Sequence, residues 1–210
     1  MLPAESIIAF SLASMLLSLS PGPDNLFVLS QSAIHGKKTG FTITLGLCTG
    51  LIVHTCAVAL GVAALLQSSP TAFQLLKFLG AIYLSYLAYQ SFRAKPSQLE
   101  NGLTSTPLQL KKLYRRGLIM SMSNPKLSIF FLAFLPQFAS PANGPMAPQI
   151  FLLGALFAII GMIIFFIFAT LADKIGSFLR HSDKAQIYLY RLSGLIFAAF
   201  AIALIFAEIN

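Results

Sequence analysis

This 210-residue chain has little charge, two cysteines and no tryptophan. Only 10% of its residues are charged, whereas a typical soluble domain has about 25%. Apolar residues make up 57% of the chain, and the mean hydropathy is +0.81. A chain with so little charge does not have the composition of a water-soluble globular protein, and its apolar content favours a protein that lies in a membrane.

The sequence also lacks the motifs of common enzyme classes. It contains no His-Glu-x-x-His, Gly-x-Ser-x-Gly, P-loop, Cys-x-x-Cys or Gly-rich dinucleotide motif. Cys48 and Cys56 lie about 12 Å apart along one expected helix, too far for a mutual disulfide. His54 is their only neighbour of metal-ligating type, and it points almost opposite to Cys56. We therefore predict no enzyme activity, no cofactor and no metal site.

Six apolar segments occupy almost the whole chain. Each is near or above the length of about 20 residues that a helix needs to cross a bilayer. They cover roughly residues 4–30, 40–66, 72–92, 115–138, 148–171 and 189–208. The sequence therefore predicts an all-α polytopic membrane protein with six transmembrane helices, formed by residues 1–210 as a single transporter domain.

The net charge of +8 is unevenly placed. Most Lys and Arg residues lie in or beside the connections after the first, third and fifth segments: Lys37, Lys38, Arg93, Lys95, Lys111, Lys112, Arg115, Arg116, Lys174, Arg180, Lys184 and Arg191. The other connections and both termini carry none. This alternation is typical of the positive-inside rule and does not favour a nucleic-acid partner. It predicts that these three connections are cytoplasmic and that both termini are periplasmic.

Two of the apolar segments are interrupted at corresponding places. The first is broken at Pro21-Gly22-Pro23 and the fourth at Asn124-Pro125, and a charged residue follows each break, Asp24 or Lys126. Proline disrupts a helix, and free backbone groups in a membrane are tolerated only beside protein or a cavity. Paired breaks of this kind in the two halves of a chain indicate a transporter's binding site.

The two halves also share a second pattern. Lys77, Gly80 and two aromatic residues, Tyr83 and Tyr86, recur in register as Arg191, Gly194, Phe197 and Phe200. We interpret residues 1–105 and 106–210 as two inverted three-helix repeats, although Gly and aromatic residues also match by chance in membrane helices. Lys77 and Arg191 are expected to reach the membrane interface from the ends of their spans.

Three ionisable residues lie within the expected spans: Asp24, His54 and Lys126. Such residues are costly in a membrane and are candidates for function. We take them, with Asn25, Asn124 and Tyr83, as the substrate-binding or coupling set. Alternatives stay open: Asp24 is also suited to be a helix N-cap, Asp24 and Lys126 to form a structural ion pair, and His54 to be a packing residue rather than a proton relay.

Glycines mark the expected helix-packing positions. Gly46, Gly50 and Gly61 share one face with His54, within an arc of roughly 80°, and small residues there allow close helix approach. Gly80 and Gly194 are expected to pack as well.

The sequence resembles the lysine exporter and homoserine–threonine exporter superfamily (LysE/RhtB type) of bacterial amino-acid efflux proteins. The resemblance covers essentially the whole chain and rests on residues 20–25, 35–40, 80–84, 124–126, 130–131 and 135–138 and on Gly46-x-x-x-Gly50-x-x-x-His54. It implies export of amino acids or close derivatives from the bacterial cytoplasm across the inner membrane, driven by the proton-motive force.

We therefore expect proton-coupled efflux of small amino acids, with homoserine or threonine as the leading substrates. One anion and one cation at equal depth would complement a zwitterion. The alternatives are an exporter of another small solute, such as a cation or metabolite, and a non-transporting membrane subunit. A homodimer stays open.

Overall fold

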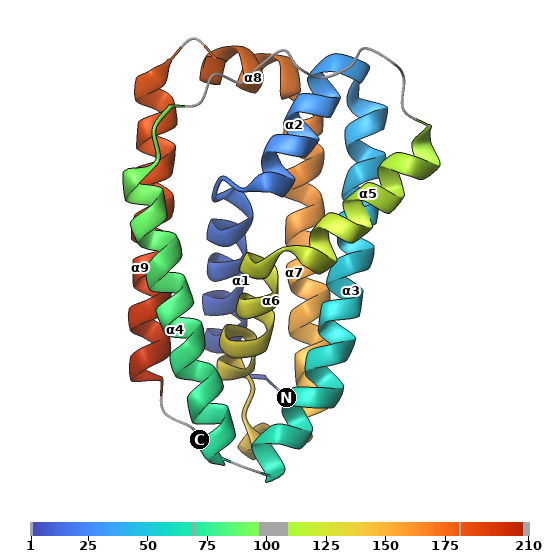
Figure 1. Cartoon of the computed structure of the whole chain (residues 1–210). Helices are drawn as coiled ribbons and strands as arrows, with labels where there is room; N and C mark the ends of the chain where they lie inside the picture. Colours follow the sequence, from blue (N-terminus) through green and yellow to red (C-terminus); the bar gives the residue numbers. More distant parts are fainter. Residues whose placement is uncertain (1, 69, 97–108, 181, 208–210) are drawn as a thin grey trace.

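The structure is a computed structural model that describes residues 2–68, 70–96, 109–180 and 182–207 (Figure 1). Every regular element in these ranges is a helix, and strands are absent from them. This confirms the predicted all-α fold.

Four helices are long and apolar enough to cross a membrane by themselves. They are α3 (Lys37–Ser68), α4 (Pro70–Arg93), α7 (Met146–Thr170) and α9 (Asp183–Phe206). Two bent pairs raise the number of candidate spans in the described residues to six if each pair is one span. One pair is α1 (Ala4–Leu19) with α2 (Pro23–His35), bent by 58°. The other is α5 (Leu110–Ser123) with α6 (Pro125–Ile129), bent by 50° and continued to Phe138 by a π-helical turn, η1 (Phe130–Phe134), and a 3₁₀ turn, η2 (Leu135–Phe138).

The helix breaks lie where the prolines predict them. A residue before proline is disfavoured in the helical conformation, because its backbone clashes with the proline ring. Ser20, Gly22 and Asn124 each precede a proline, and all three are extended, with ψ of 122°, 173° and 106°. Pro23 and Pro125 then take the first helical position of α2 and α6, where a missing N–H costs nothing.

The bent pairs run in opposite directions. In Figure 1, α1 and α2 rise from the lower to the upper end of the bundle, whereas α5 and α6 descend. Helix α7 packs on α1, and α3 packs on α5, so each half places a straight helix against the broken helix of the other half. This arrangement is what an inverted pair of repeats requires, and we keep the repeat as a proposal.

Glycines allow α3 and α5 to pack closely. A Cβ atom added at Gly46 would overlap the backbone carbonyl oxygen of Tyr114, and one at Gly50 would overlap the side chain of Ser121. Gly117 of α5 makes the reciprocal approach to the carbonyl oxygen of Ile43 and was not predicted. The packing role expected for Gly46 and Gly50 therefore agrees with the contacts.

Gly80 and Gly194 pack between α4, α9 and η1. A Cβ atom at Gly80 would lie 2.6 Å from Cβ of Ala133, and one at Gly194 would lie 2.8 Å from the ring of Phe92. Gly61 differs from these glycines. It is exposed, and a Cβ atom there would meet nothing within 4 Å, so the packing role predicted for it has no contact in the described residues.

Aromatic side chains fill the core in the half of the bundle where α1 begins and α9 ends. Neighbouring ring centroids lie between 4.7 and 6.0 Å apart in the pairs Phe10–Phe130, Phe10–Phe138, Phe130–Phe157 and Phe134–Phe200. Aromatic pairs at these separations pack favourably and exclude water. This half of the bundle is therefore closed by a phenyl plug formed by Phe10, Phe130, Phe131, Phe134, Phe138, Phe157 and Phe200.

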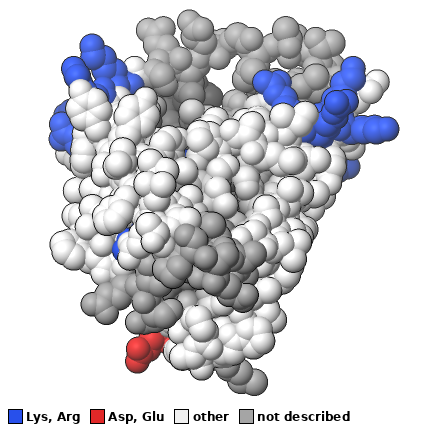
Figure 2. Space-filling model, turned by 60° about the horizontal axis from the view of Figure 1, so that its bottom comes forward, with Lys and Arg blue, Asp and Glu red and all other residues white. Residues whose placement is uncertain are grey.

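Basic side chains gather at the other end. Figure 2 shows Lys and Arg together at one end of the molecule, where α3 and α5 begin, α4 ends and the amphipathic α8 (Ala172–Arg180) crosses the bundle. The short α8 was not predicted. Lys77 is only 4% exposed, and its Nζ donates to the carbonyl oxygen of Ala207 at 2.7 Å, just after the end of α9; its reach to the membrane interface stays a prediction.

Candidate functional site

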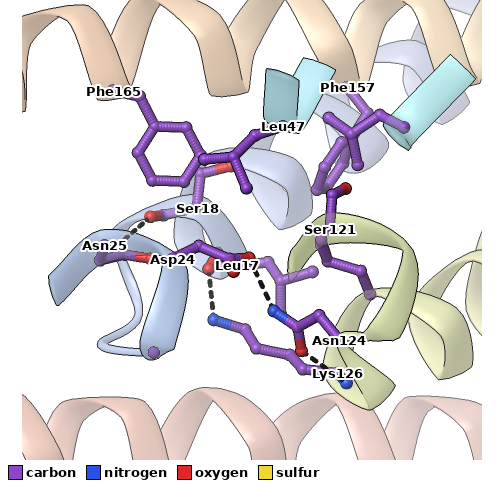
Figure 3. Close-up of a pocket in the computed structure, with 13 residues that line it drawn as sticks. Leu17, Ser18, Asp24, Asn25, Leu47, Ser121, Asn124, Lys126, Phe157 and Phe165 are labelled. Atoms are coloured by element: carbon purple, nitrogen blue, oxygen red, sulfur yellow. Dashed lines mark hydrogen bonds between the residues drawn. The ribbon is translucent and has the colours of Figure 1, made fainter. Parts of the chain in front are cut away.

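The two helix breaks face each other across a small internal cavity (Figure 3). Asp24 and Asn25 of α2, Lys126 of α6 and the intervening Asn124 line it, together with apolar side chains such as Phe157. The cavity offers about 20 Å³ to the centre of a water molecule, which is room for one or two waters. An amino acid does not fit in this conformation, so binding one requires the breaks to move apart.

Asn124 connects the two breaks with a single side chain. Its Oδ1 accepts a hydrogen bond from the backbone N–H of Lys126 at 3.0 Å, which caps α6. Its Nδ2 donates to Oδ2 of Asp24 at 2.6 Å, a bond between the two halves of the chain that is visible in Figure 3. Asn124 is therefore the N-cap of α6. The alternative that Asp24 is the N-cap of α2 is wrong, because the N-cap of α2 is Gly22, without a side-chain bond, and Asp24 lies in the first turn.

Lys126 caps the end of the other broken span. Its ammonium donates to the carbonyl oxygens of Leu17 at 2.9 Å, in the last turn of α1, and of Ser20 at 3.0 Å, the C-cap residue. The ammonium also lies 5.4 Å from the ring centroid of Phe197. A cation is favoured at the carboxyl end of a helix because that end carries partial negative charge. Lys126 therefore satisfies two of the backbone carbonyls that the first break leaves open.

Asp24 keeps one carboxylate oxygen without a partner. The residue is 5% exposed, and its Oδ1 is buried without a hydrogen bond in the described structure. The amino end of α2 favours a negative charge in its first turn. Within the described residues no direct ion pair joins Asp24 to Lys126, although the two charges line one cavity and interact electrostatically. Asn124 links the carboxylate of Asp24 to the backbone N–H of Lys126 and not to its ammonium group, so a pairing of the two charges stays a prediction.

The remaining predicted residues lie at different distances from the cavity. Asn25 lines it and donates from Nδ2 to the carbonyl of Ser18 at 2.7 Å, which ties α2 back to α1. His54 is not among the lining residues. Its Nε2 lies 3.1 Å from the carbonyl oxygen of Ser121, and Ser121 lines the cavity. Tyr83, on α4, does not line the cavity, and its ring lies 6.2 Å from that of Tyr86.

Sequence reasoning missed the serines beside each break. Ser18 and Ser121 line the cavity, and each lies in the last turn before a proline break. The repeated order of a Ser, one apolar residue and a second Ser, at residues 18–20 and 121–123, was the available signal. No group of three or more His, Cys, Asp or Glu side chains in the described ranges could hold a metal ion.

Comparison with known proteins adds independent evidence. A family model described as LysE type translocator matches residues 15–208. A homoserine/homoserine lactone efflux protein of Salmonella typhimurium is 34% identical over 82% of this chain and 82% of its own length. An uncharacterized membrane protein of Vibrio cholerae is 31% identical over 90% and 91%. A leucine efflux protein of Salmonella choleraesuis is 28% identical over 91% of each chain. No solved structure gives a significant match.

Proposed function

Because the chain belongs to the LysE-type translocator family, a family of membrane transporters rather than enzymes, we propose that it exports small amino acids. Two of its relatives are named as efflux proteins for homoserine or its lactone and for leucine. We propose homoserine- or threonine-like substrates, proton antiport, and a place in the bacterial inner membrane with both termini in the periplasm. The basic end of the bundle would then face the cytoplasm.

The observation that best supports an amino-acid substrate is the pair of opposite charges in one cavity. Oδ1 of Asp24 has no partner and is available to a substrate ammonium group. The ammonium of Lys126 is bonded only to neutral carbonyls, and a substrate carboxylate is a stronger acceptor than a carbonyl. A zwitterionic amino acid therefore complements both walls of the cavity.

Substrate binding in this site would weaken the contacts that hold the two halves together. The Asn124–Asp24 bond and the bonds from Lys126 to Leu17 and Ser20 all cross between the halves. A substrate that takes over Asp24 and Lys126 competes with each of them. Rocking of one inverted half against the other would then expose the site alternately to the two sides of the membrane.

The same carboxylate can couple export to protons. Asp24 can hold either a substrate ammonium group or a proton but not both, and such competition drives the two in opposite directions. His54 is one residue away from the cavity, through Ser121, and is a candidate to pass the proton on.

Counterflow and gradient-driven export in proteoliposomes test these steps. Purified protein should exchange labelled homoserine or threonine without any partner, and an imposed pH gradient should accelerate net export. His54→Gln should abolish the gradient effect but keep counterflow, since exchange moves no net proton. Equal loss of both activities, or of neither, would support the packing role of His54.

Absence of amino-acid counterflow would refute the proposed substrate. Activity with another solute would then identify a different exporter, and no activity at all would favour a non-transporting subunit.

A further inference from the structure

Buried polar groups without partners gather on one side of the cavity. Six buried side-chain oxygen or nitrogen atoms make no hydrogen bond in the described part of the chain, and five of them belong to residues 20–35. These are Ser20 Oγ, Asp24 Oδ1, Gln31 Oε1, Ser32 Oγ and His35 Nε2; the sixth is Ser121 Oγ at the cavity. Since most buried polar groups in native proteins have partners, a cluster of exceptions requires an explanation.

Four of these groups belong to α2: those of Asp24, Gln31, Ser32 and His35. At about 100° per residue, Asp24, Gln31 and His35 fall within an arc of roughly 40°, and Ser32 lies about 60° to one side of it. The face begins at the cavity and continues along α2 to the basic end of the bundle (Figure 1). Gln31 and Ser32 are 2% and 4% exposed. We call this face the α2 polar stripe.

At Ser32 the stripe is covered where α2, α3 and α7 meet. A Cβ atom added at Gly40 of α3 would overlap Ser32 Oγ and would lie 2.6 Å from Cβ of Ala169 near the end of α7. Only a glycine allows the three helices to meet this closely. Helix α8 begins three residues after Ala169 and also packs on α2.

The opposite half of the bundle has a different interior. The phenyl plug fills it, and Gln149, a buried amide in that half, is fully used: its Nε2 donates to the carbonyls of Ser140 and Gly144, both at 2.9 Å, and its Oε1 accepts from the N–H of Ser140 at 3.1 Å. Within the described residues, an aromatic half whose buried Gln149 has partners and a half with unpartnered groups on α2 therefore flank the same cavity.

We propose that the α2 polar stripe is the wall of the route between the cytoplasm and the cavity, and that the contact of Ser32, Gly40 and Ala169 is its gate. The proposal rests on the proposed export function for the direction of movement. Separation of the three helices would let water reach Gln31, Ser32 and His35 and provide the partners that they lack when the route is closed. Gln31 then offers its amide to a passing zwitterion before Asp24 binds it.

Replacement of Gln31 by leucine tests this directly. If the polar groups of the stripe lack partners only in the closed state, replacing Gln31 by leucine should have opposite effects on stability and on transport. Gln31→Leu should raise the midpoint of thermal unfolding by about 2–4 °C, because it removes an unsatisfied buried acceptor. It should also slow amino-acid counterflow by about tenfold, because a stabilised closed state opens less often. The matched control is Gln149→Leu, which removes the hydrogen bonds of Gln149 to Ser140 and Gly144 and should lower the unfolding midpoint.

The outcome of this pair decides the proposal. A lower midpoint for Gln31→Leu, or counterflow at the wild-type rate, would overturn it. If the wild-type protein carries no amino acid, the proposed function fails. The proposed route is then tested only by whether Gln31 can be reached from the cytoplasmic face.

Cysteine labelling supplies that measurement. In a background without Cys48 and Cys56, Gln31→Cys should react with a membrane-impermeant maleimide applied to the cytoplasmic face of inside-out vesicles. Ser14→Cys, an isosteric change in the fully buried part of α1 on the other side of the break, should not react from that face. Equal protection of both positions would show that the stripe does not open to the cytoplasm and would refute the route.

Discussion

The arrangement at the breaks predicts that Asp24→Asn and Lys126→Gln depend strongly on each other. Lys126→Gln removes two charge-assisted hydrogen bonds to the carbonyls of Leu17 and Ser20 and leaves Asp24 without a nearby cation. Removing one member of a buried charge pair costs about 3–5 kcal/mol, because the other charge stays buried without compensation. We expect a loss of stability of that size for Lys126→Gln.

Asp24→Asn should be milder. An asparagine at position 24 can still accept the hydrogen bond from Nδ2 of Asn124, and Lys126 keeps both carbonyl acceptors. The change replaces a charge-assisted bond by a neutral one, a loss of about 1–2 kcal/mol. In the double variant the penalty for a stranded carboxylate disappears. The double variant should therefore be more stable than Lys126→Gln alone, with a coupling of about 1–3 kcal/mol.

Reversible unfolding in mixed detergent micelles measures all four members of this cycle. Counterflow of labelled homoserine is the parallel functional assay, and all three variants should lack it because each removes a charge that a zwitterion needs. Additive stability losses within about 0.5 kcal/mol would show that the two residues are independent. Wild-type transport by Lys126→Gln would refute the role of the charge pair in binding.

Two further predictions concern helix contacts, and a third concerns the topology. Asn124→Ala should lower stability by about 1–2 kcal/mol, through loss of the α6 cap, and should slow counterflow, as measured by unfolding and transport; an unchanged variant would contradict its connecting role. Gly46→Ala should reduce the yield of folded protein, because its Cβ overlaps backbone, whereas Gly61→Ala should be tolerated within about 0.5 kcal/mol; equal effects would argue against the seam. In intact cells, an impermeant thiol reagent should label Ala142→Cys but not Lys37→Cys, and the reverse pattern would invert the proposed topology.

Local chemistry made the helices and their breaks predictable. Apolar runs longer than a bilayer needs, separated by basic connections, predict spans without any knowledge of packing. Pro21, Pro23 and Pro125 act on the backbone beside them, so the position of each break follows from the sequence. Their position inside apolar segments also identified Asp24 and Lys126 as ionisable residues that are costly to bury in a membrane.

The partners of those residues were not predictable, because they depend on packing between the halves. Backbone carbonyls carry no sequence signal, so the bonds from Lys126 to α1 could not be foreseen. Asn124 was predicted to bind substrate. Its role as a cap that also bonds Asp24 could not be predicted, because the two residues are 100 positions apart and the sequence does not give the distance between the two breaks. Gly61 shows the same limit: its helical phase places it with Gly46 and Gly50, but a neighbour at its level depends on packing, and a Cβ atom there meets nothing within 4 Å in the described residues.

The two breaks satisfy part of each other's hydrogen-bonding groups, which lowers the cost of the charged site that we propose for substrate binding. Lys126 from the second half caps the carbonyl end of α1, and Asp24 from the first half receives the amide of Asn124, which caps α6. Neither half can move away alone without leaving polar groups unsatisfied in a low-dielectric interior, which keeps the halves together in the absence of substrate. A zwitterion carries the one pair of groups that can replace both partners at once. Its carboxylate compensates Lys126 and its ammonium group compensates Asp24, so the contacts between the halves become dispensable when the site is loaded. A neutral or singly charged solute replaces only one of them and leaves the other contact in place. Selectivity for amino acids and the ability to change conformation would therefore have a common origin in the reciprocal capping of the two breaks.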